Sequence, residues 1–469
     1  MKDINLAKLS IAHAAAALRA GELSPLELTE AYLDRIEALN PRVNAYITVT
    51  AERARDDARR ATEELAAGRS RGPLHGIPIA HKDLYETAGI RTTGGSKIHA
   101  DHIPTADSTV ARKLREAGTI LLGKLNTHEY AYGVTTNNPH YGPTRNPWDL
   151  ARIPAGSSGG SGAAIAAGLA TATTGSDTGG SIRMPASLCG VVGLKPTYGR
   201  VSKAGVLPLS WRFDHTGPLT RTVLDAGLMF NAIAGYDPAD ATSLRLPFED
   251  VTKGIGEGIR GLRVGVPRGY FFDQLEDEVA TALAAAITEL QRLGAQVCEV
   301  DIPGVLEGVW GLFGFVHAEA LQIHAHAIEH RLQDFGEDLR AILGSPAPEA
   351  ATLMLGLRYC DALAVGMRTA LESIDVLITP TTPVTAPRIG QETVAYGDTE
   401  EPVLHAMIRC TAPFNATHLP ALSLPCGFTR GGLPVGMQIA GRPFDEATVL
   451  RVGHAYEQAM DWRQRVPVL

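Results

Sequence analysis

The chain has 469 residues, of which 45% are hydrophobic and 20% charged, and its formal net charge is −8. This composition is typical of a globular protein with a large core, and it lacks the basic surplus of a nucleic-acid-binding domain. The cysteines are few and widely spaced, which excludes a CxxC zinc or redox motif and favours buried free thiols in a reducing compartment. They are Cys189, Cys298, Cys360, Cys410 and Cys426.

The N-terminal region has the pattern of neither a secretion signal nor a membrane anchor. His13 and Arg19 interrupt its apolar residues, so the apolar run of a signal peptide is missing. No stretch of the chain approaches the roughly 18 apolar residues of a membrane-spanning helix. We therefore expect a cytoplasmic protein with no membrane contact.

Helical and strand patterns alternate along the chain. Ser24, Pro25 and Glu27 form a capping box with proline at the first helical position, which predicts a helix up to about residue 40. The later predicted segments are a helix over 51–67, a short apolar run over 77–85, a helix and a strand within 108–126, a strand over 261–269, a helix over 277–294 and strands over 295–303, 374–383 and 420–427. This alternation indicates an α/β fold with a largely buried sheet, and the polar segment 236–261 is expected to be a surface excursion.

Two motifs suggest nucleotide or metal chemistry, and a structural interpretation is preferred for both. Gly118 to Lys124 matches the P-loop pattern, but Leu125 supplies no hydroxyl for magnesium and the intervening residues predict a strand. His326, Glu329 and His330 match an inverted zinc-protease motif, but no third ligand can be identified, so a polar helix face is the better interpretation. We expect no metal and no cofactor.

A third motif, Gly156-x-Ser158-x-Gly160, matches the nucleophile elbow of α/β-hydrolases. That elbow needs a strand directly before it, and the preceding "RNPWDLARIPA" has no strand pattern. The match is therefore expected to be accidental.

The stretch "PAGSSGGSGAAIAAGLATATTGSDTGGSIRMPAS", Pro154 to Ser187, places glycine-serine clusters at both ends of one apolar helix. A flexible linker is unsuitable here because the helix begins directly after the first cluster. Successive amides in the second cluster can form an anion-binding nest, and chemistry at a carbonyl group needs such donors for the developing oxyanion.

These motifs resemble those of the amidase signature family: "AGSSGGS", a small apolar helix, "GSDTGGSIRMPAS", and upstream "GIPIAHKD". The resemblance implies a Ser–cis-Ser–Lys triad. Its nucleophile would be Ser181, its bridging serine Ser157, with a cis peptide bond between Gly156 and Ser157, and its base Lys82.

The resemblance also implies the surroundings of the triad. The amides of Thr178, Gly179, Gly180 and Ser181 would form the oxyanion hole. Asp177 and Arg183 would be structural supports, and Ser158 would hydrogen-bond nearby with a lesser effect on rate.

The resemblance covers most of the chain. It extends from about residue 72 to 243, returns in "IDVLITPTTP" and "GLPVGMQIAGRPFDEATVL", and is faint over about 271–371, where we expect the variable substrate pocket. It implies one domain over 1–469, in which a twisted mixed β-sheet is covered by α-helices. The sequence departs from the family at Ala155, where glycine is usual, and we expect little consequence because alanine is also small.

A lysine can act as the base only if its amine is neutral. Its ordinary pKa is roughly 10.4, and burial can lower that value by about three to five units. Lys82 follows an apolar run, so a buried neutral amine is expected. The adjacent Asp83 would oppose neutrality, and we expect its carboxylate to point elsewhere, onto backbone amides.

The resemblance implies a hydrolase that cleaves carboxylic amides through a serine acyl-enzyme. Esters, carbamates and anilides are compatible with the same triad. The segment "LSWRFDHTGP", Leu209 to Pro218, is more similar to free-standing amidases than to the A subunit of tRNA-dependent glutamine amidotransferases, which typically carries "SSLDQ". We therefore expect a stand-alone amidase, with that A subunit, which releases ammonia from glutamine, as the alternative.

The expected partners are a small amide-type substrate and water, with no nucleic acid and no membrane. Homodimers are common in the family, although the sequence does not set the oligomeric state. Trp211, Phe213 and the segment 310–330 contain the aromatic and apolar residues of a candidate substrate pocket, and core packing is an equal alternative for them.

Overall fold

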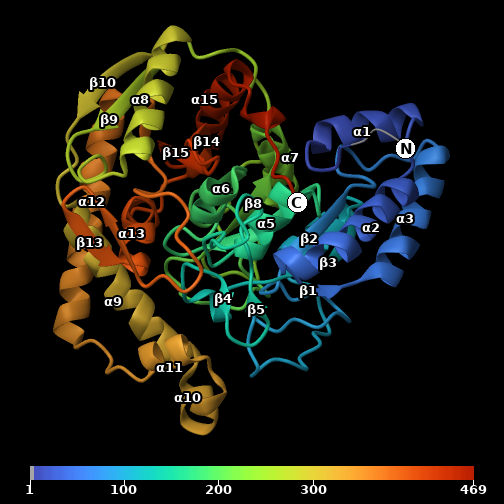
Figure 1. Cartoon of the computed structure of the whole chain (residues 1–469), viewed down its shortest axis with the longest axis horizontal. Helices are drawn as coiled ribbons and strands as arrows, with labels where there is room; N and C mark the ends of the chain where they lie inside the picture. The colour runs from blue at the N-terminus through green and yellow to red at the C-terminus, as the bar shows by residue number, and fades with distance from the viewer. Residues whose placement is uncertain (1–4) are drawn as a thin grey trace.

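A mixed sheet of 11 strands runs through the computed structural model of the chain, which describes residues 5–469 (Figure 1). In spatial order the strands are β1 (Tyr46–Val49), β3 (Ile120–Leu125), β2 (Pro78–Lys82), β6 (Ala172–Asp177), β8 (His215–Thr220), β7 (Val192–Lys195), β14 (Ala421–Phe428), β15 (Pro434–Gly441), β11 (Val376–Pro380), β9 (Arg263–Pro267) and β10 (Gln296–Val300). Strand β2 runs parallel to β3 and β6, whereas the central strands from β6 to β11 pair antiparallel. The α/β prediction with a mixed sheet is confirmed.

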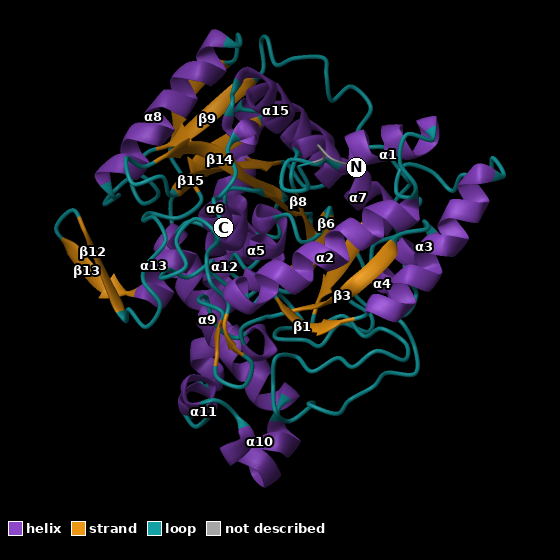
Figure 2. Cartoon of the chain, turned by 45° about the vertical axis from the view of Figure 1, so that its right-hand side comes forward, coloured by secondary structure: helices purple, strands orange, loops and turns teal. Residues whose placement is uncertain are grey.

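Helices cover both faces of this sheet, and two short hairpins lie outside it. The hairpins are β4 (Asn137–Asn138) with β5 (Gly142–Pro143), and β12 (Thr393–Tyr396) with β13 (Thr399–Pro402), which projects from the edge of the molecule in Figure 2. The helices are α1 (Ile11–Ala20), α2 (Pro25–Val43), α3 (Ala51–Ala66), α4 (Thr109–Glu116), α5 (Gly159–Ala167), α6 (Arg183–Cys189), α7 (Val223–Ile233), α8 (Asp277–Arg292), α9 (Val305–Ile323), α10 (Ala325–Arg331), α11 (Glu337–Leu343), α12 (Ala350–Ser373), α13 (Val403–Arg409), α14 (Ala412–Ala416) and α15 (Glu446–Ala459).

The predicted elements agree with the structure within a few residues. The capping box at Ser24 is formed, because the Ser24 hydroxyl accepts from the Glu27 amide and the Glu27 carboxylate accepts from the Ser24 amide. Helix α2 continues beyond residue 40 to Val43 and ends at Asn44 in the left-handed conformation. The segment 236–261 contains neither helix nor strand, as expected for a surface excursion.

Helix α5, between the two glycine-serine clusters, is buried along its whole length. A Cβ atom at Gly160 would lie 2.4 Å from the carbonyl oxygen of Asn126. The face of α5 that contains Gly160 can therefore pack this closely only because glycine has no side chain. The close packing fixes both clusters against the ends of β2 and β6.

Helices α9 and α12 pack against each other with their backbones in contact. A Cβ atom at Gly311 on α9 would lie 2.3 Å from the carbonyl oxygen of Gly356 on α12. By length and composition alone, α12 could cross a membrane, contrary to the expectation from the sequence. Its side chains Cys360, Leu363 and Met367 are buried in the core between these helices, which is equally typical of a core helix.

We predict that Gly311→Ala loosens the α9–α12 contact. The added methyl group would overlap backbone, so the two helices must separate, at a cost of about 1–3 kcal/mol of folding free energy. Gly314→Ala, one turn further along α9, meets only Leu353 at 3.7 Å and should stabilise the helix by up to about 1 kcal/mol. Thermal unfolding followed by circular dichroism should give a lower Tm for the first variant than for the second, and equal values would contradict the packing described here.

Candidate active site

Lys82 ends β2 and is completely buried. Its Nζ donates hydrogen bonds to Ser157 Oγ at 2.7 Å and to Ser176 Oγ at 2.9 Å. Its backbone amide donates to Thr174 Oγ1 at 3.2 Å. Thr174 and Ser176 are two residues apart on β6, so their side chains project from the same face of the sheet and meet this lysine.

Ser157 lies in the first glycine-serine cluster, and the peptide bond between Gly156 and Ser157 is cis. Its carbonyl oxygen accepts three hydrogen bonds, from Thr127 Oγ1 at 2.9 Å, the His128 amide at 3.1 Å and Thr136 Oγ1 at 3.3 Å. The bridging serine of the predicted triad is therefore held by the loop that follows β3.

Ala155, the departure from the family pattern, has a φ of 63°. This is the left-handed region, which favours glycine because a side chain crowds the backbone there. The usual glycine thus has a structural reason, and the strain at Ala155 was not expected from its small size. The hydroxyl of Thr136 donates to the Ala155 carbonyl at 2.9 Å and helps to hold this conformation.

Ser181 lies in the second cluster, and its backbone carbonyl accepts from the Ser158 amide at 3.2 Å. The Ser158 hydroxyl donates to the carbonyl of Ser176 at 3.2 Å, so this side chain connects the first cluster to β6. The two clusters are therefore joined directly by hydrogen bonds.

The loop 178–181 presents free amides. Within residues 5–469, no hydrogen bond uses the amides of Thr178, Gly179, Gly180 or Ser181 as donors. Gly180 has a φ of 136°, and a Cβ atom there would lie 2.1 Å from Thr411 Oγ1. The Thr411 hydroxyl donates to the Gly179 carbonyl at 2.6 Å and fixes the loop from behind.

Asp177 and Arg183 form a buried ion pair at 2.8 Å next to this loop. Burial by itself would raise the pKa of Asp177, but the Arg183 guanidinium lowers it to about 2, so the carboxylate stays ionised. It accepts from the Ile182 amide, and Arg183 also donates to Asn415 Oδ1 and Gln438 Oε1. The pair ties the second cluster to α14 and β15.

Burial lowers the pKa of Lys82 to about 7, although the carboxylates of Asp214 and Asp177 act in the opposite direction. Asp83 faces away from Lys82: its carboxylate accepts from the amide of Thr93 at 2.9 Å and lies 3.4 Å from Lys124 Nζ. Lys124, the last residue of the P-loop match, is buried on strand β3 and pairs with this aspartate. A neutral amine on Lys82 is therefore accessible near neutral pH.

Ser181 opens into a cavity of about 40 Å³ with an almost entirely apolar lining. Phe313, Leu404 and Ile408 line both this cavity and an outer one of about 430 Å³, which begins at Trp310 and Leu306. Trp310 is 72% exposed at its mouth. No charged side chain lines the inner cavity; the described residues that line it are Ala131, Tyr132, Gly133, Val134, Thr178, Gly179, Ser181, Met184, Leu209, Leu312, Phe313, Val316, Leu404 and Ile408.

The aromatic residues named from the sequence are divided among different environments. Trp310 lines the outer cavity and Phe313 lines both the outer and the inner cavity, whereas Phe213 is fully buried in the core around α9 and α12. Trp211 is 52% exposed and lines a separate cavity. Trp310 and Phe313 therefore remain candidates for the substrate pocket, whereas Phe213 serves core packing.

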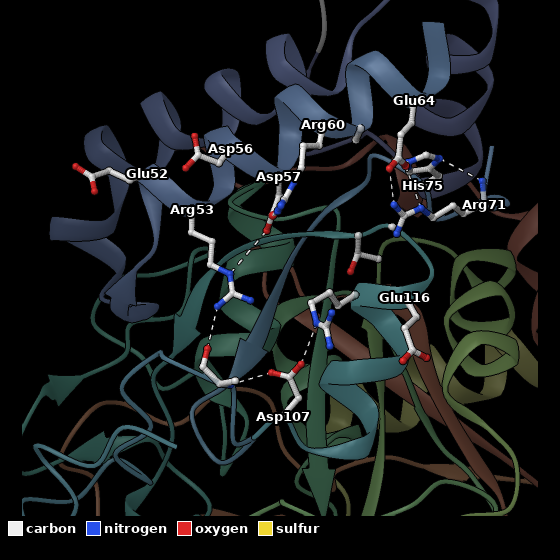
Figure 3. Close-up of a pocket in the computed structure, with 15 residues that line it drawn as sticks. Glu52, Arg53, Asp56, Asp57, Arg60, Glu64, Arg71, His75, Asp107 and Glu116 are labelled. Carbon is white, nitrogen blue, oxygen red and sulfur yellow. Dashed lines mark hydrogen bonds and ion pairs between the residues drawn. The ribbon is translucent and has the colours of Figure 1, made fainter. Parts of the chain in front are cut away.

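His326 and His330 lie on α10, which has no buried residue, and their ring centroids are 4.5 Å apart. A cavity of about 980 Å³, shown in Figure 3, is lined by none of the predicted triad residues. It lies between α3 and α4, and its charged residues pair with one another, as in Arg71 with Glu64 and Arg115 with Asp107. Neither feature includes a predicted site residue.

Three residues at this site were missed from the sequence. Ser176, the second acceptor for Lys82, stands directly before Asp177, and strand alternation with Thr174 was the signal that could have found it. Thr136 and Asp214 lie in segments without a chemical motif, and only the folded chain brings them to the triad. Asp214 accepts from Thr178 Oγ1 at 2.6 Å.

Comparison with known proteins places the chain in a large family. The family model described as Amidase matches residues 27–450. The chain is 44% identical to the A subunit of Glutamyl-tRNA(Gln) amidotransferase of Moorella thermoacetica, over 96% of each chain. Among solved structures, a chain of a vestigial complex that reveals the evolutionary origins of an s-triazine catabolic enzyme is 36% identical, with a TM-score of 0.93, over 96% of this chain and 98% of that one. A bacterial aryl acylamidase of the amidase signature family is 27% identical, with a TM-score of 0.90, over 97% of each chain.

One prediction from the sequence is wrong in the light of these relatives. We expected partners limited to a small amide, water and at most a second copy of the chain, with no nucleic acid. Relatives with 41–44% identity are named as one subunit of an enzyme that acts on a glutamyl-tRNA. The lack of surplus basic residues argues only against direct binding of nucleic acid by this chain. It does not argue against membership of an assembly in which another subunit binds a tRNA.

Three findings agree: the family model matches most of the chain, the fold is shared with solved amidases, and the relatives are similar over nearly their whole length. The chain belongs to the amidase signature family of C–N hydrolases.

Proposed function

We propose that this chain releases ammonia from glutamine as the A subunit of a tRNA-dependent amidotransferase in the cytoplasm. The observation that carries the proposal is the identity of 44% to such a protein, which extends over 96% of both chains. The net charge of −8 favours a division of labour in which other subunits contact the tRNA.

In this proposal Ser181 is the nucleophile, Ser157 relays its proton and the neutral amine of Lys82 accepts it. The hydrogen bond of 2.7 Å between Lys82 Nζ and Ser157 Oγ supports the relay, because a base must lie within hydrogen-bond reach of the proton it takes. Attack on the side-chain amide of glutamine would give an acyl-enzyme and ammonia, and water would then release glutamate. The unpaired amides of residues 178–181 would hold the oxyanion in both steps.

A second candidate is hydrolysis of an amide with apolar substituents, such as an anilide. One observation favours it: the inner cavity at Ser181 is lined by no charged side chain, whereas the free carboxylate and ammonium of glutamine call for charged or hydrogen-bonding partners. Under this candidate, residues of 271–371, among them Phe313, would select the substrate.

We predict that Ser181→Ala abolishes amide hydrolysis, whereas Ser158→Ala only weakens it. Loss of the nucleophile should lower kcat by roughly four orders of magnitude or more. The Ser158 hydroxyl donates to the carbonyl of Ser176 on β6 and accepts from its amide, so the loss of these two hydrogen bonds should lower kcat by roughly tenfold to a hundredfold. Steady-state kinetics of the two purified variants measure this difference, and full activity of Ser181→Ala would refute the assignment.

The rate should depend on pH through Lys82. Because only the neutral amine accepts a proton, kcat/KM should rise through a midpoint near the pKa of about 7 and level off above it. Asp214→Asn removes a negative charge that favours the protonated amine, so the midpoint should move to lower pH. A profile independent of pH between about 6 and 8 would argue against Lys82 as the base.

The two candidate functions are separated by their products. Ammonia release from glutamine is measured for the purified chain, alone and mixed with the other subunits of an amidotransferase, ATP and glutamyl-tRNA, with Ser181→Ala as control. The proposal expects ammonia from glutamine that depends on Ser181 and increases in the mixture. If the chain releases amines from aryl amides but no ammonia from glutamine, the amidotransferase proposal is wrong and the second candidate takes its place.

A further inference from the structure

The loop that follows β3, residues 126–136, contacts Ser157 on one side and α11 on the other. Towards Ser157 it supplies the three donors that hold the backbone carbonyl of this residue. Three of its non-glycine residues have a positive φ, which is 48° at Tyr130, 62° at Ala131 and 56° at Thr136. Because side chains disfavour this left-handed region, the loop keeps its shape only where surrounding contacts enforce it.

His128 connects the two sides of this loop. Its backbone amide is one of the donors to the Ser157 carbonyl, at 3.1 Å. Its ring is buried, and Nε2 donates to Asp338 Oδ2 on α11 at 2.8 Å, since a carboxylate can only accept. In the neutral ring Nδ1 then accepts from Thr135 Oγ1 at 3.4 Å.

The His128 ring also packs against the backbone near the two catalytic clusters. A Cβ atom at Gly133, which lines the inner cavity, would lie 2.2 Å from His128 Nε2. A Cβ atom at Gly156 would lie 2.8 Å from the amide nitrogen of Thr135. His128 therefore supports the segment of Ser157 in two ways, through its own amide and through Thr135.

A second contact anchors α11 to the same loop. The carboxylate of Glu129, which is completely buried, accepts from the Gly336 amide at 2.8 Å, directly before α11. The same carboxylate accepts from Ser96 Oγ at 2.6 Å and from His140 Nε2 at 2.9 Å. The start of α11 is thus fixed against the loop, and Asp338 in its first turn is held next to the His128 ring.

Helix α11 packs on its other side against α9. Leu339 and Leu343 of α11 belong to the same buried core as Leu312 and Val316, two α9 residues that line the inner cavity. Asp338 stands next to Leu339, but its side chain is 49% exposed. This helix therefore connects the wall of the inner cavity with the loop that follows β3.

We propose that Asp338 is a positioning residue for Ser157 and acts through His128. The inference rests on the triad of the proposed function, in which Ser157 relays a proton, and not on which amide is cleaved. Asp338 fixes the His128 ring, and His128 fixes the loop whose donors hold the Ser157 carbonyl. The relay depends on this placement, because Ser157 Oγ must stay within hydrogen-bond reach of Lys82 Nζ.

The test measures the rate and the extent of Ser181 labelling by a fluorophosphonate, with the labelled residue identified by mass spectrometry. Asp338→Ala removes the acceptor of the His128 ring and should slow labelling by roughly three- to tenfold, the effect of one hydrogen bond, although labelling should still reach completion. Asp338→Asn keeps an acceptor oxygen and should stay within roughly twofold of the parent chain. In steady-state kinetics kcat should fall by the same factor with KM unchanged, because neither Asp338 nor His128 lines the inner or the outer cavity.

Two further variants locate the effect. Glu337→Ala is the matched control, because it removes the same negative charge from the same turn of α11, where Glu337 is exposed and its side chain has no hydrogen bond within residues 5–469. Its labelling rate should equal that of the parent chain. His128→Phe removes the bond from the other partner and should slow labelling at least as much as Asp338→Ala. The double variant should then be no slower than His128→Phe alone.

Labelling of Asp338→Ala at the parent rate would overturn the inference, as would equal slowing in Glu337→Ala or Asp338→Asn, or additive losses in the double variant. Incomplete labelling of Asp338→Ala at an unchanged rate would show that Asp338 only stabilises the fold, and the inference would again be wrong. If Asp338→Ala does not fold, His128→Phe compared with Glu337→Ala decides in its place. If Ser181 is not labelled even in the parent chain, the triad of the proposed function fails, and the inference fails with it.

Discussion

The hydrogen bond between Lys82 and Ser157 is the constraint on which the rest of this site depends. A lysine with no exposed surface is stable only if its amine is neutral or its hydrogen bonds are satisfied, and here two serine hydroxyls meet it. Both hydroxyls come from segments far from β2 in the sequence. Helix α5 connects the two segments, and its glycines, such as Gly160, allow it to pack closely against its neighbours.

The surroundings of this hydrogen bond divide the site into two different sides. Ser181 faces an apolar cavity that continues to the surface between α9 and α13, where Trp310 is exposed. Ser176 lines a separate cavity, which is also lined by the acidic residues Asp214 and Asp240. Lys82 itself lines neither cavity, and its amine contacts the hydroxyls of Ser157 and Ser176 instead.

Charged groups near the lysine are placed so that its pKa is set mainly by burial. Asp177 is paired with Arg183, and Asp83 is paired with Lys124, so neither carboxylate contacts the amine directly. This arrangement explains how an aspartate next to the lysine in sequence is compatible with a neutral amine. It also gives the lysine of the P-loop match a purely structural role.

Local patterns in the sequence were sufficient to predict the individual helices and strands. The capping box at Ser24, the buried strands and the apolar helix between the clusters follow from short-range pattern, because capping and periodicity act within a few residues. The resemblance to a family motif also pointed to Lys82, Ser157 and Ser181 as candidates, and the structure joins the first two by a hydrogen bond. The row of glycines predicts a loop with free amides, and the amides of residues 178–181 are unpaired within residues 5–469 of the structure.

The residues that surround Lys82, Ser157 and Ser181 come from distant segments of the chain. Only the tertiary structure shows which residues these are. Ser176, Thr136 and Asp214 reach the site through strand pairing and loop packing, which no local pattern reports. Whether an aromatic residue lies in a cavity, on the surface or in the core depends on how α9 packs against α12. The strain at Ala155 depends on its positive φ, which the sequence does not reveal. The net charge did not predict the tRNA that the names of the relatives contain, because charge constrains what a surface binds directly and not which assembly a chain joins.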